Sequence, residues 1–266
     1  MLATVIKALV RRNDAVVLAA LGALVLLAWI ALLGGAGTGM DPVAMSTWRV
    51  PAALPPGSSG AWTLTYWLTV FIMWVVAMML PSASPLVLLY ARVIRQAKGQ
   101  RRDLRVRAAI AALAAGYLAI WILFSVLAVC LQWGLERAGA MSAMMSFSAI
   151  RLSGALLIVA GLYQFTPLKA ACLRHCRGPA AFLAHHWRPG VAGAWRMGLA
   201  HGSFCLGCCG LLMLLLFVGG VMNLVWIAGL TLLVAIEKLA PFGTALATVT
   251  GAALIAGGAT LVVAGL

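Results

Sequence analysis

Residues 197–236 read MGLAHGSFCLGCCGLLMLLLFVGGVMNLVWIAGLTLLVAI, a run of forty residues without Asp, Glu, Lys or Arg. A transmembrane helix needs about 20 consecutive apolar residues, so this run is long enough for two. The pair Gly219-Gly220 is the natural place for a turn between them. The run therefore predicts two transmembrane helices, at 197–218 and 221–238.

Five other apolar segments lie outside this run. The chain has 266 residues, of which 64% are hydrophobic and 9% are charged, whereas soluble domains carry roughly 25% charged residues. The first segment is longer than the apolar core of a signal peptide, about 7–15 residues, which favours a retained helix. No segment alternates as an outer-membrane barrel strand does. The prediction is an all-α polytopic transmembrane helix bundle of about seven helices, a single membrane domain over 1–266, with further spans at 15–33, 62–88, 108–132, 142–162 and 243–265.

The basic residues predict how this bundle lies in the membrane. Nineteen Lys and Arg against five Asp and Glu give a net charge of +14. With the N-terminus in the cytosol, sixteen of the nineteen bases fall on the inner side, in 1–14, 92–107, 163–196 and at Lys238. Cytoplasmic loops carry such an excess, and basic loops contact anionic lipid. The charge favours an N-in, C-out topology with membrane lipids as partners, and it does not indicate nucleic-acid binding.

One face of the 197–218 helix carries ligands for a soft metal. Four residues recur every four positions and share one stripe on a helix, with a fifth beside it: His201, Cys205, Cys209 and Met213, with Cys208. Imidazole, thiolate and thioether groups are the ligands that soft metals prefer. This stripe is therefore a candidate metal site that extends from the inner surface into the membrane.

A second pair of thiols, Cys172 and Cys176, lies in the basic segment 163–196, which is expected to be a cytosolic loop. The pair has the same i, i+4 spacing, and Pro167 and Gly178-Pro179 bound a short helical turn that would carry both thiols on one face. In the reducing cytosol they are expected to be free thiols or metal ligands rather than a disulfide. The two clusters together predict metal or redox chemistry.

The ligand types indicate which metal. Thiols with methionine nearby favour Cu(I) and then Zn(II), whereas five acids in the whole chain disfavour Mg²⁺ and Ca²⁺. Met78 and Met79 are candidates to complete the site, although buried methionines more often serve packing. Glu237 is a further candidate ligand, and the alternative is an interfacial ion pair with Lys238. No catalytic group stands out, so a binding role is favoured over an enzyme.

Three stretches resemble a bacterial family known only as predicted metal-binding integral membrane proteins, a domain of unknown function. They are MWVVAMMLPSASP (Met73–Pro85), YQFTPLKAACLRHCRGP (Tyr163–Pro179) and His201–Lys238, which begins HGSFCLGCC and ends GGVMNLVWIAGLTLLVAIEK. The resemblance implies a multi-pass, metal-binding protein of the bacterial inner membrane. Carried over by position, it implies five cysteine ligands and four other polar or soft positions: Cys172, Cys176, Cys205, Cys208 and Cys209, then Met78, Met79, Asn223 and Glu237.

The leading functional hypothesis is a protein that binds Cu(I) and holds it or moves it through the bundle. Cys172 and Cys176 would receive the ion from the cytosol, and the buried stripe would hold it. One alternative is a membrane thiol–disulfide oxidoreductase that uses Cys208-Cys209 or the Cys172/Cys176 pair. Another is an assembly factor that delivers metal to a membrane enzyme. The expected protein partner is a metallochaperone or a membrane enzyme, and the sequence contains no P-loop for ATP.

Overall fold

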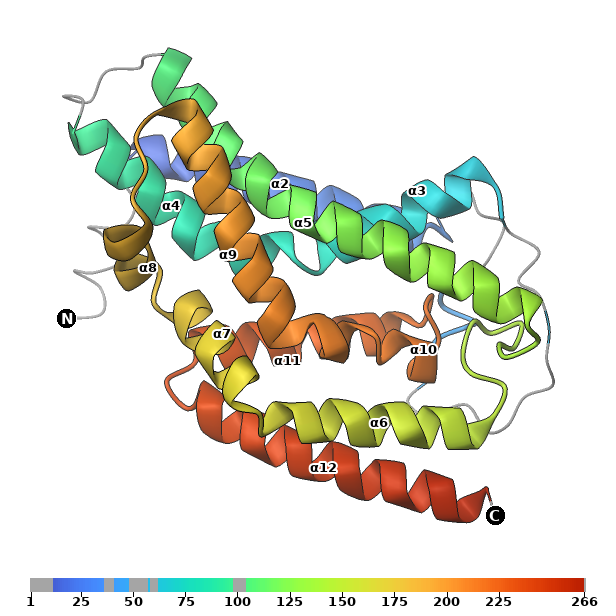
Figure 1. Ribbon diagram of the computed structural model, residues 1–266. Helices are drawn as coiled ribbons and strands as arrows, with labels where there is room; N and C mark the ends of the chain where they lie inside the picture. The colour runs from blue at the N-terminus through green and yellow to red at the C-terminus, as the bar shows by residue number, and fades with distance from the viewer. Residues whose placement is uncertain (1–11, 36–40, 48–56, 58–61, 98–103, 266) are drawn as a thin grey trace.

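The computed structural model describes residues 12–35, 41–47, 57, 62–97 and 104–265, and this part of the chain is built from helices (Figure 1). Within it, strand-like pairing is limited to one bridge between Met141 and Phe147. The all-α prediction is confirmed. Five of the sixteen basic residues predicted to face inward, in 1–11 and 98–103, lie outside the described residues. In chain order the helices are α2 (Arg12–Leu33), α3 (Leu64–Ile72), a π-helical turn (Met73–Ala77), α4 (Leu80–Ala97), α5 (Leu104–Arg137), α6 (Ile150–Gln164), α7 (Pro167–Arg177), α8 (Pro179–His186), α9 (Gly190–Met213), α10 (Leu216–Gly219), α11 (Leu224–Leu239) and α12 (Gly243–Ala264).

Three helical segments are long and apolar enough to cross a membrane: α5, α12, and α9 continued by α10. Two further helix pairs reach this length only as bent spans, α3 with α4 at 48° and α6 with α7 at 67°. The apolar part of α2, Val17–Leu33, is shorter. The described residues therefore contain three to five candidate spans, and the number of seven, with its orientation, stays a prediction.

The two helices expected within 197–236 are present but differ in extent. α9 begins earlier than expected and ends before a short turn, and α10 then leads to Gly220, which has a φ of 99°. Only glycine adopts this conformation readily, so the Gly-Gly pair does mark the turn. Asn223 caps α11 by accepting two backbone N–H bonds. The segment 163–196 is not an irregular loop, since it folds into α7, α8 and the first turns of α9.

A kink between α3 and α4 frees backbone carbonyls inside the bundle. Pro81 and Pro85 each lack a backbone N–H, so the carbonyls four residues earlier lose their helical partners. The Ser84 hydroxyl donates to the Pro81 carbonyl at 2.7 Å, which replaces the bond that Pro85 cannot make. The Met79 carbonyl, in the same kink, accepts a hydrogen bond of 2.9 Å from the Tyr117 hydroxyl of α5. The kink thus ties α4 to α5 through polar contacts.

Glycines let two pairs of helices approach until their backbones touch. Figure 1 shows α6 and α12 side by side and α9 crossing α5. In the α6–α12 pair, a Cβ atom on Gly258 would lie 2.6 Å from the carbonyl oxygen of Gly154. In the α5–α9 pair, Gly116 and Gly198 face each other in the same way. Small residues at such contacts are typical of membrane helix pairs. The α5–α9 contact fixes the helix that carries most of the cysteines.

Gly258 offers a test of the α6–α12 contact. A leucine there would push against the backbone of α6, and we expect a loss of about 1–3 kcal/mol of stability, the usual cost of overpacking. A Cβ on the preceding residue, Gly257, would meet no atom within 4 Å, so Gly257→Leu is a matched control. Thermal unfolding in detergent should show a lower midpoint for Gly258→Leu than for Gly257→Leu. Equal midpoints would contradict the close packing.

Candidate metal centre

α7 forms where the sequence predicts a short helix, and it carries two cysteines. Thr166 caps it, because its hydroxyl accepts the backbone N–H of Lys169 at 3.3 Å, and Pro167 begins it. Gly178 follows its last turn. α7 turns by 67° from α6 and packs against α9. This bend brings α7 to the thiol-rich face of α9.

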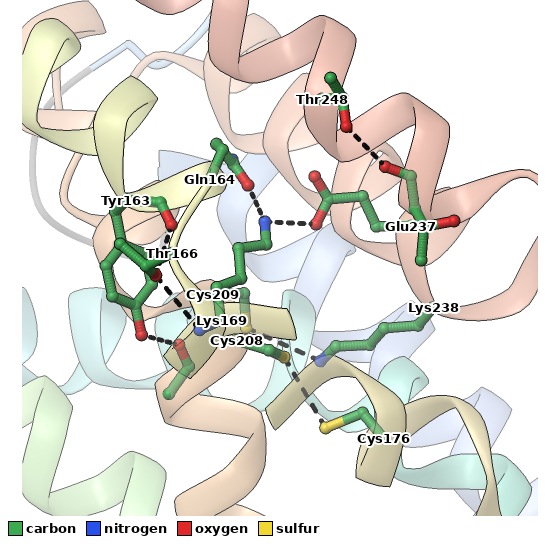
Figure 2. Close-up of polar contacts among 12 residues, drawn as sticks. Tyr163, Gln164, Thr166, Lys169, Cys176, Cys208, Cys209, Glu237, Lys238 and Thr248 are labelled. Carbon is green, nitrogen blue, oxygen red and sulfur yellow. Dashed lines mark hydrogen bonds and ion pairs between the residues drawn. The ribbon is translucent and has the colours of Figure 1, made fainter. Parts of the chain in front are cut away.

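Three thiols from α7 and α9 form a compact group, which we call the three-thiol site: Cys176, Cys205 and Cys208. Their Sγ atoms all lie within 4.8 Å of one another, and those of Cys176 and Cys208 are 3.7 Å apart (Figure 2). Cys205 and Cys208 are each 1% exposed, and Cys176 is half-buried. Within the described ranges, no other three His, Cys, Asp or Glu residues lie close enough to hold one metal ion.

A buried lysine of α11 contacts the three-thiol site. Lys238 Nζ lies 2.9 Å from Cys205 Sγ and 3.7 Å from Cys209 Sγ, and it donates to Ser82 Oγ at 3.2 Å. Figure 2 shows the lysine side chain extended toward Cys208 and Cys209. An ammonium group beside sulfur favours the thiolate form that binds metal. Lys238 therefore supplies positive charge where bound thiolates would be negative.

Two hydroxyls complete the surroundings of Cys205. Tyr117 Oη lies 3.1 Å from Cys205 Sγ, and Ser82 Oγ lies 3.9 Å from it. The two hydroxyls are 3.0 Å from each other. The thiols of Cys208 and Cys209 instead donate to the Cys205 carbonyl, at 3.1 and 3.0 Å. The site therefore joins α4, α5, α7, α9 and α11. The Cys205 sulfur is the one with a lysine and two hydroxyls around it.

The other predicted cysteine and histidine ligands surround the three-thiol site without joining it. Cys172 packs against α9, where a Cβ atom on Gly207 would lie 2.6 Å from its Sγ. Cys209 faces Lys238, whose Nζ lies 3.7 Å from the Cys209 Sγ. His201 is 2% exposed, its ring lies beside Tyr117, and its Nδ1 has no hydrogen-bond partner in the described residues. These three stay candidate ligands at the edge of the site.

The predicted methionine ligands lie in the apolar core that encloses the thiols. Met78, Met79 and Met213 are each at most 2% exposed and belong to the same buried cluster as Cys205 and Cys208. Met79 reaches the site through its backbone carbonyl, which holds Tyr117. Their positions fit the packing role that the sequence allowed as an alternative.

Glu237 forms a buried ion pair with α7. Its Oε2 lies 2.8 Å from Lys169 Nζ, and both side chains are 2% exposed (Figure 2). Gln164 accepts a further bond from Lys169, and Arg177 donates to the Glu237 backbone carbonyl at 2.5 Å. Glu237 and Lys238 therefore make separate buried contacts instead of one interfacial pair. These contacts hold α7, with its cysteines, against the end of α11.

Removing one partner of this ion pair should destabilise the fold. Lys169→Met leaves the Glu237 carboxylate buried without its cation, which costs about 3–5 kcal/mol. The double variant Lys169→Met/Glu237→Gln removes both charges and should recover most of the loss. The measurement is unfolding in detergent by heat or denaturant. A double variant as unstable as the single one would show that the unpaired carboxylate is not the cause.

Sequence reasoning did not identify Lys238, Tyr117 or Ser82 as parts of the site. Lys238 was visible as a charge at the end of an apolar run, but that position is also typical of the membrane interface. Ser82 follows a proline, where hydroxyls commonly satisfy freed carbonyls. Tyr117 carries no such signal, because it stands alone in an apolar helix.

Comparison with known proteins agrees with this chemistry. The PpoB2 family, described as a copper chaperone, matches residues 67–261, which include all three thiols and Lys238. A search of the curated proteins and a search of the solved structures each found no match. The metal-binding part of the expected resemblance is confirmed, whereas the membrane part is not tested by the match. The family matches most of the chain, so this protein belongs to the PpoB2 family of copper chaperones.

Proposed function

We propose that this protein is a membrane copper chaperone that holds Cu(I) between the thiols of Cys176, Cys205 and Cys208. The observation that carries the proposal is the closeness of three thiols on two helices, within 4.8 Å of one another and beside an ammonium group. A soft metal about 2.3 Å from each of three sulfurs holds those sulfurs about 4 Å apart. The 3.7 Å between Cys176 and Cys208 fits that requirement.

Three thiols suit copper as a cargo better than zinc as a structural ion. Structural Zn(II) sites are almost always four-coordinate, whereas soft thiolates select Cu(I). A cargo must also leave, and the half-buried Cys176 is the one member of the site that is not fully enclosed. We infer that copper passes to or from a partner protein on the Cys176 side.

The proposed setting is the bacterial inner membrane, with α7 and α8 on the cytosolic side. Figure 1 shows α7 and α8 at the end of the bundle where α2 begins. Basic residues gather in this region, at Lys169, Arg174, Arg177, Arg188 and Arg196, as expected of a cytosolic segment. The partner would then be a cytosolic metallochaperone that supplies copper or a membrane enzyme that receives it.

The test is the copper content of the protein purified in detergent and loaded anaerobically with Cu(I). We expect one equivalent with sulfur ligands at about 2.3 Å in X-ray absorption. Cys130→Ser is the control variant and should bind copper as the wild type does, because Cys130 is exposed and outside the site. Zinc bound in preference to copper would favour a structural clamp, and the absence of any sulfur-bound metal would refute the proposal.

A thiol–disulfide oxidoreductase is the second candidate, favoured by the 3.7 Å between Cys176 and Cys208. A disulfide needs about 2.05 Å between the sulfurs, so a modest shift of α7 would join them. Mass spectrometry of oxidised and reduced protein would detect this bond. A reversible Cys176–Cys208 disulfide without copper retention would support this function over the first.

A further inference from the structure

A second group of metal-binding side chains lies beside α8, outside the three-thiol site. His175 of α7 and His185 and His186 of α8 line a small pocket of about 170 Å³, together with Arg174. His175 and His186 are half-buried, and His185 is exposed. The function proposed above uses none of these side chains.

Backbone hydrogen bonds determine which nitrogen of each ring is free. His175 Nδ1 lies 2.9 Å from the Ala171 carbonyl, and His186 Nδ1 lies 3.2 Å from the Phe182 carbonyl. A carbonyl only accepts, so each Nδ1 carries the proton and donates it. In the neutral rings the lone pair is then on Nε2, for which the described residues provide no partner. Metal-binding histidines show this arrangement, with the other nitrogen donating to a carbonyl or carboxylate.

Aromatic packing holds the two rings near each other. His175 stacks on Phe204 of α9, with ring centroids 4.1 Å apart and planes within 5°, and His186 stacks on Phe182 at 4.6 Å. The centroids of His175 and His186 are 6.0 Å apart. A metal ion about 2.0–2.1 Å from both Nε2 atoms, in a near-linear arrangement, would hold the centroids about 6 Å apart. The centroid spacing therefore leaves room for one two-coordinate ion between the rings.

The histidine pair adjoins the three-thiol site through both of its helices. His175 directly precedes Cys176 on α7, and its stacking partner Phe204 directly precedes Cys205 on α9. The pocket has exposed lining residues, including His185, whereas Cys205 is buried. An ion that arrives in the pocket beside α8 therefore meets imidazole before it reaches the buried thiol of Cys205.

We propose that His175 and His186 form a second copper site, which takes up Cu(I) and passes it to the three thiols. Only the second step rests on the function proposed above. Soft Cu(I) prefers thiolate to imidazole, so the transfer is favourable. It is a ligand exchange without change of oxidation state, and the thiols release their protons to water as they bind. The guanidinium of Arg174 in the same pocket favours an ion that arrives with an anionic co-ligand.

The first test isolates the histidine pair in the full-length chain. In the background Cys176→Ser/Cys205→Ser/Cys208→Ser, anaerobic titration with Cu(I) against a coloured chelator should find one equivalent, bound through nitrogen in X-ray absorption. Adding His175→Gln/His186→Gln should remove it, and adding the control His185→Gln should not. Absence of nitrogen-bound copper, or its survival without His175 and His186, would overturn the proposal.

The second test concerns transfer, with all thiols present. His175→Gln/His186→Gln should leave the equilibrium affinity of the sulfur-bound copper unchanged, which also shows that the variant is folded, and should slow its loading several-fold. An unchanged loading rate would refute the transfer step. Wild-type protein with nitrogen-bound but no sulfur-bound copper would instead refute the three-thiol site and leave the histidine site standing.

Discussion

Changing Cys176, Cys205 and Cys208 together to serine should abolish sulfur-bound copper. Serine preserves the size of each side chain, but its hydroxyl is a hard ligand that does not replace a thiolate for a soft metal. Metal binding by a thiolate-rich site is worth about 10–16 kcal/mol in zinc-finger peptides, so the loss of all three ligands removes a binding free energy of that order. Competition titration combined with X-ray absorption should show a full equivalent of sulfur-bound copper in the wild type and no sulfur-bound copper in the variant.

Two other cysteines make this prediction specific. Cys130 is exposed on α5, so Cys130→Ser should bind copper as the wild type does. Cys172 shares α7 with Cys176 but packs against Gly207, so Cys172→Ser should also retain the ion. If copper binding were lost with Cys172 and kept without Cys176, the wrong α7 thiol would have been assigned. Sulfur-bound copper retained by the triple variant would refute the three-thiol site.

Sequence spacing accounts for two of the three thiols in the three-thiol site. It places Cys205 and Cys208 on neighbouring positions of one helix face, and α9 is helical through both. It cannot choose between Cys172 and Cys176, because both repeat at the same interval. That choice depends on how α7 lies on α9, where Gly207 leaves room for the Cys172 sulfur. Which α7 cysteine joins the site depends on packing between helices distant in sequence, and no local sequence pattern predicts it.

The fold shows the same division between local and distant causes. Composition and run length predict a helical protein, and the turn at Gly219-Gly220 follows from residues that break helices. The break after Met213 has no such signal, because the sequence around it is uniformly apolar. The 67° bend between α6 and α7 is likewise stabilised by a distant residue, Glu237, which pairs with Lys169. Local chemistry therefore predicts the elements, and contacts between elements decide their angles.

Lys238→Met should weaken Cu(I) binding by about a hundredfold or more, since removing the partner of a buried charge costs about 3–5 kcal/mol and 1.4 kcal/mol is tenfold. Cu(I) on three thiolates leaves two negative charges in a buried site. Lys238 Nζ, 2.9 Å from Cys205 Sγ, offsets one of them. Methionine has nearly the length of lysine, and copper-free thiols can keep their protons, so the fold should persist. Competition titration against a Cu(I) chelator measures the loss.

Two further variants separate charge from packing and hydrogen bonding. Lys238→Arg keeps the positive charge and should bind copper far more tightly than Lys238→Met does. Ser82→Ala removes the 3.2 Å hydrogen bond to Lys238 but no charge, so its effect should correspond to about 0.5–1.5 kcal/mol. Equal losses in Ser82→Ala and Lys238→Met would show that the lysine acts by hydrogen bonding alone. Wild-type affinity in Lys238→Met would show that its charge does not stabilise bound copper. An affinity that follows the charge, and not the hydrogen bond, would make Lys238 a counter-ion of the copper site.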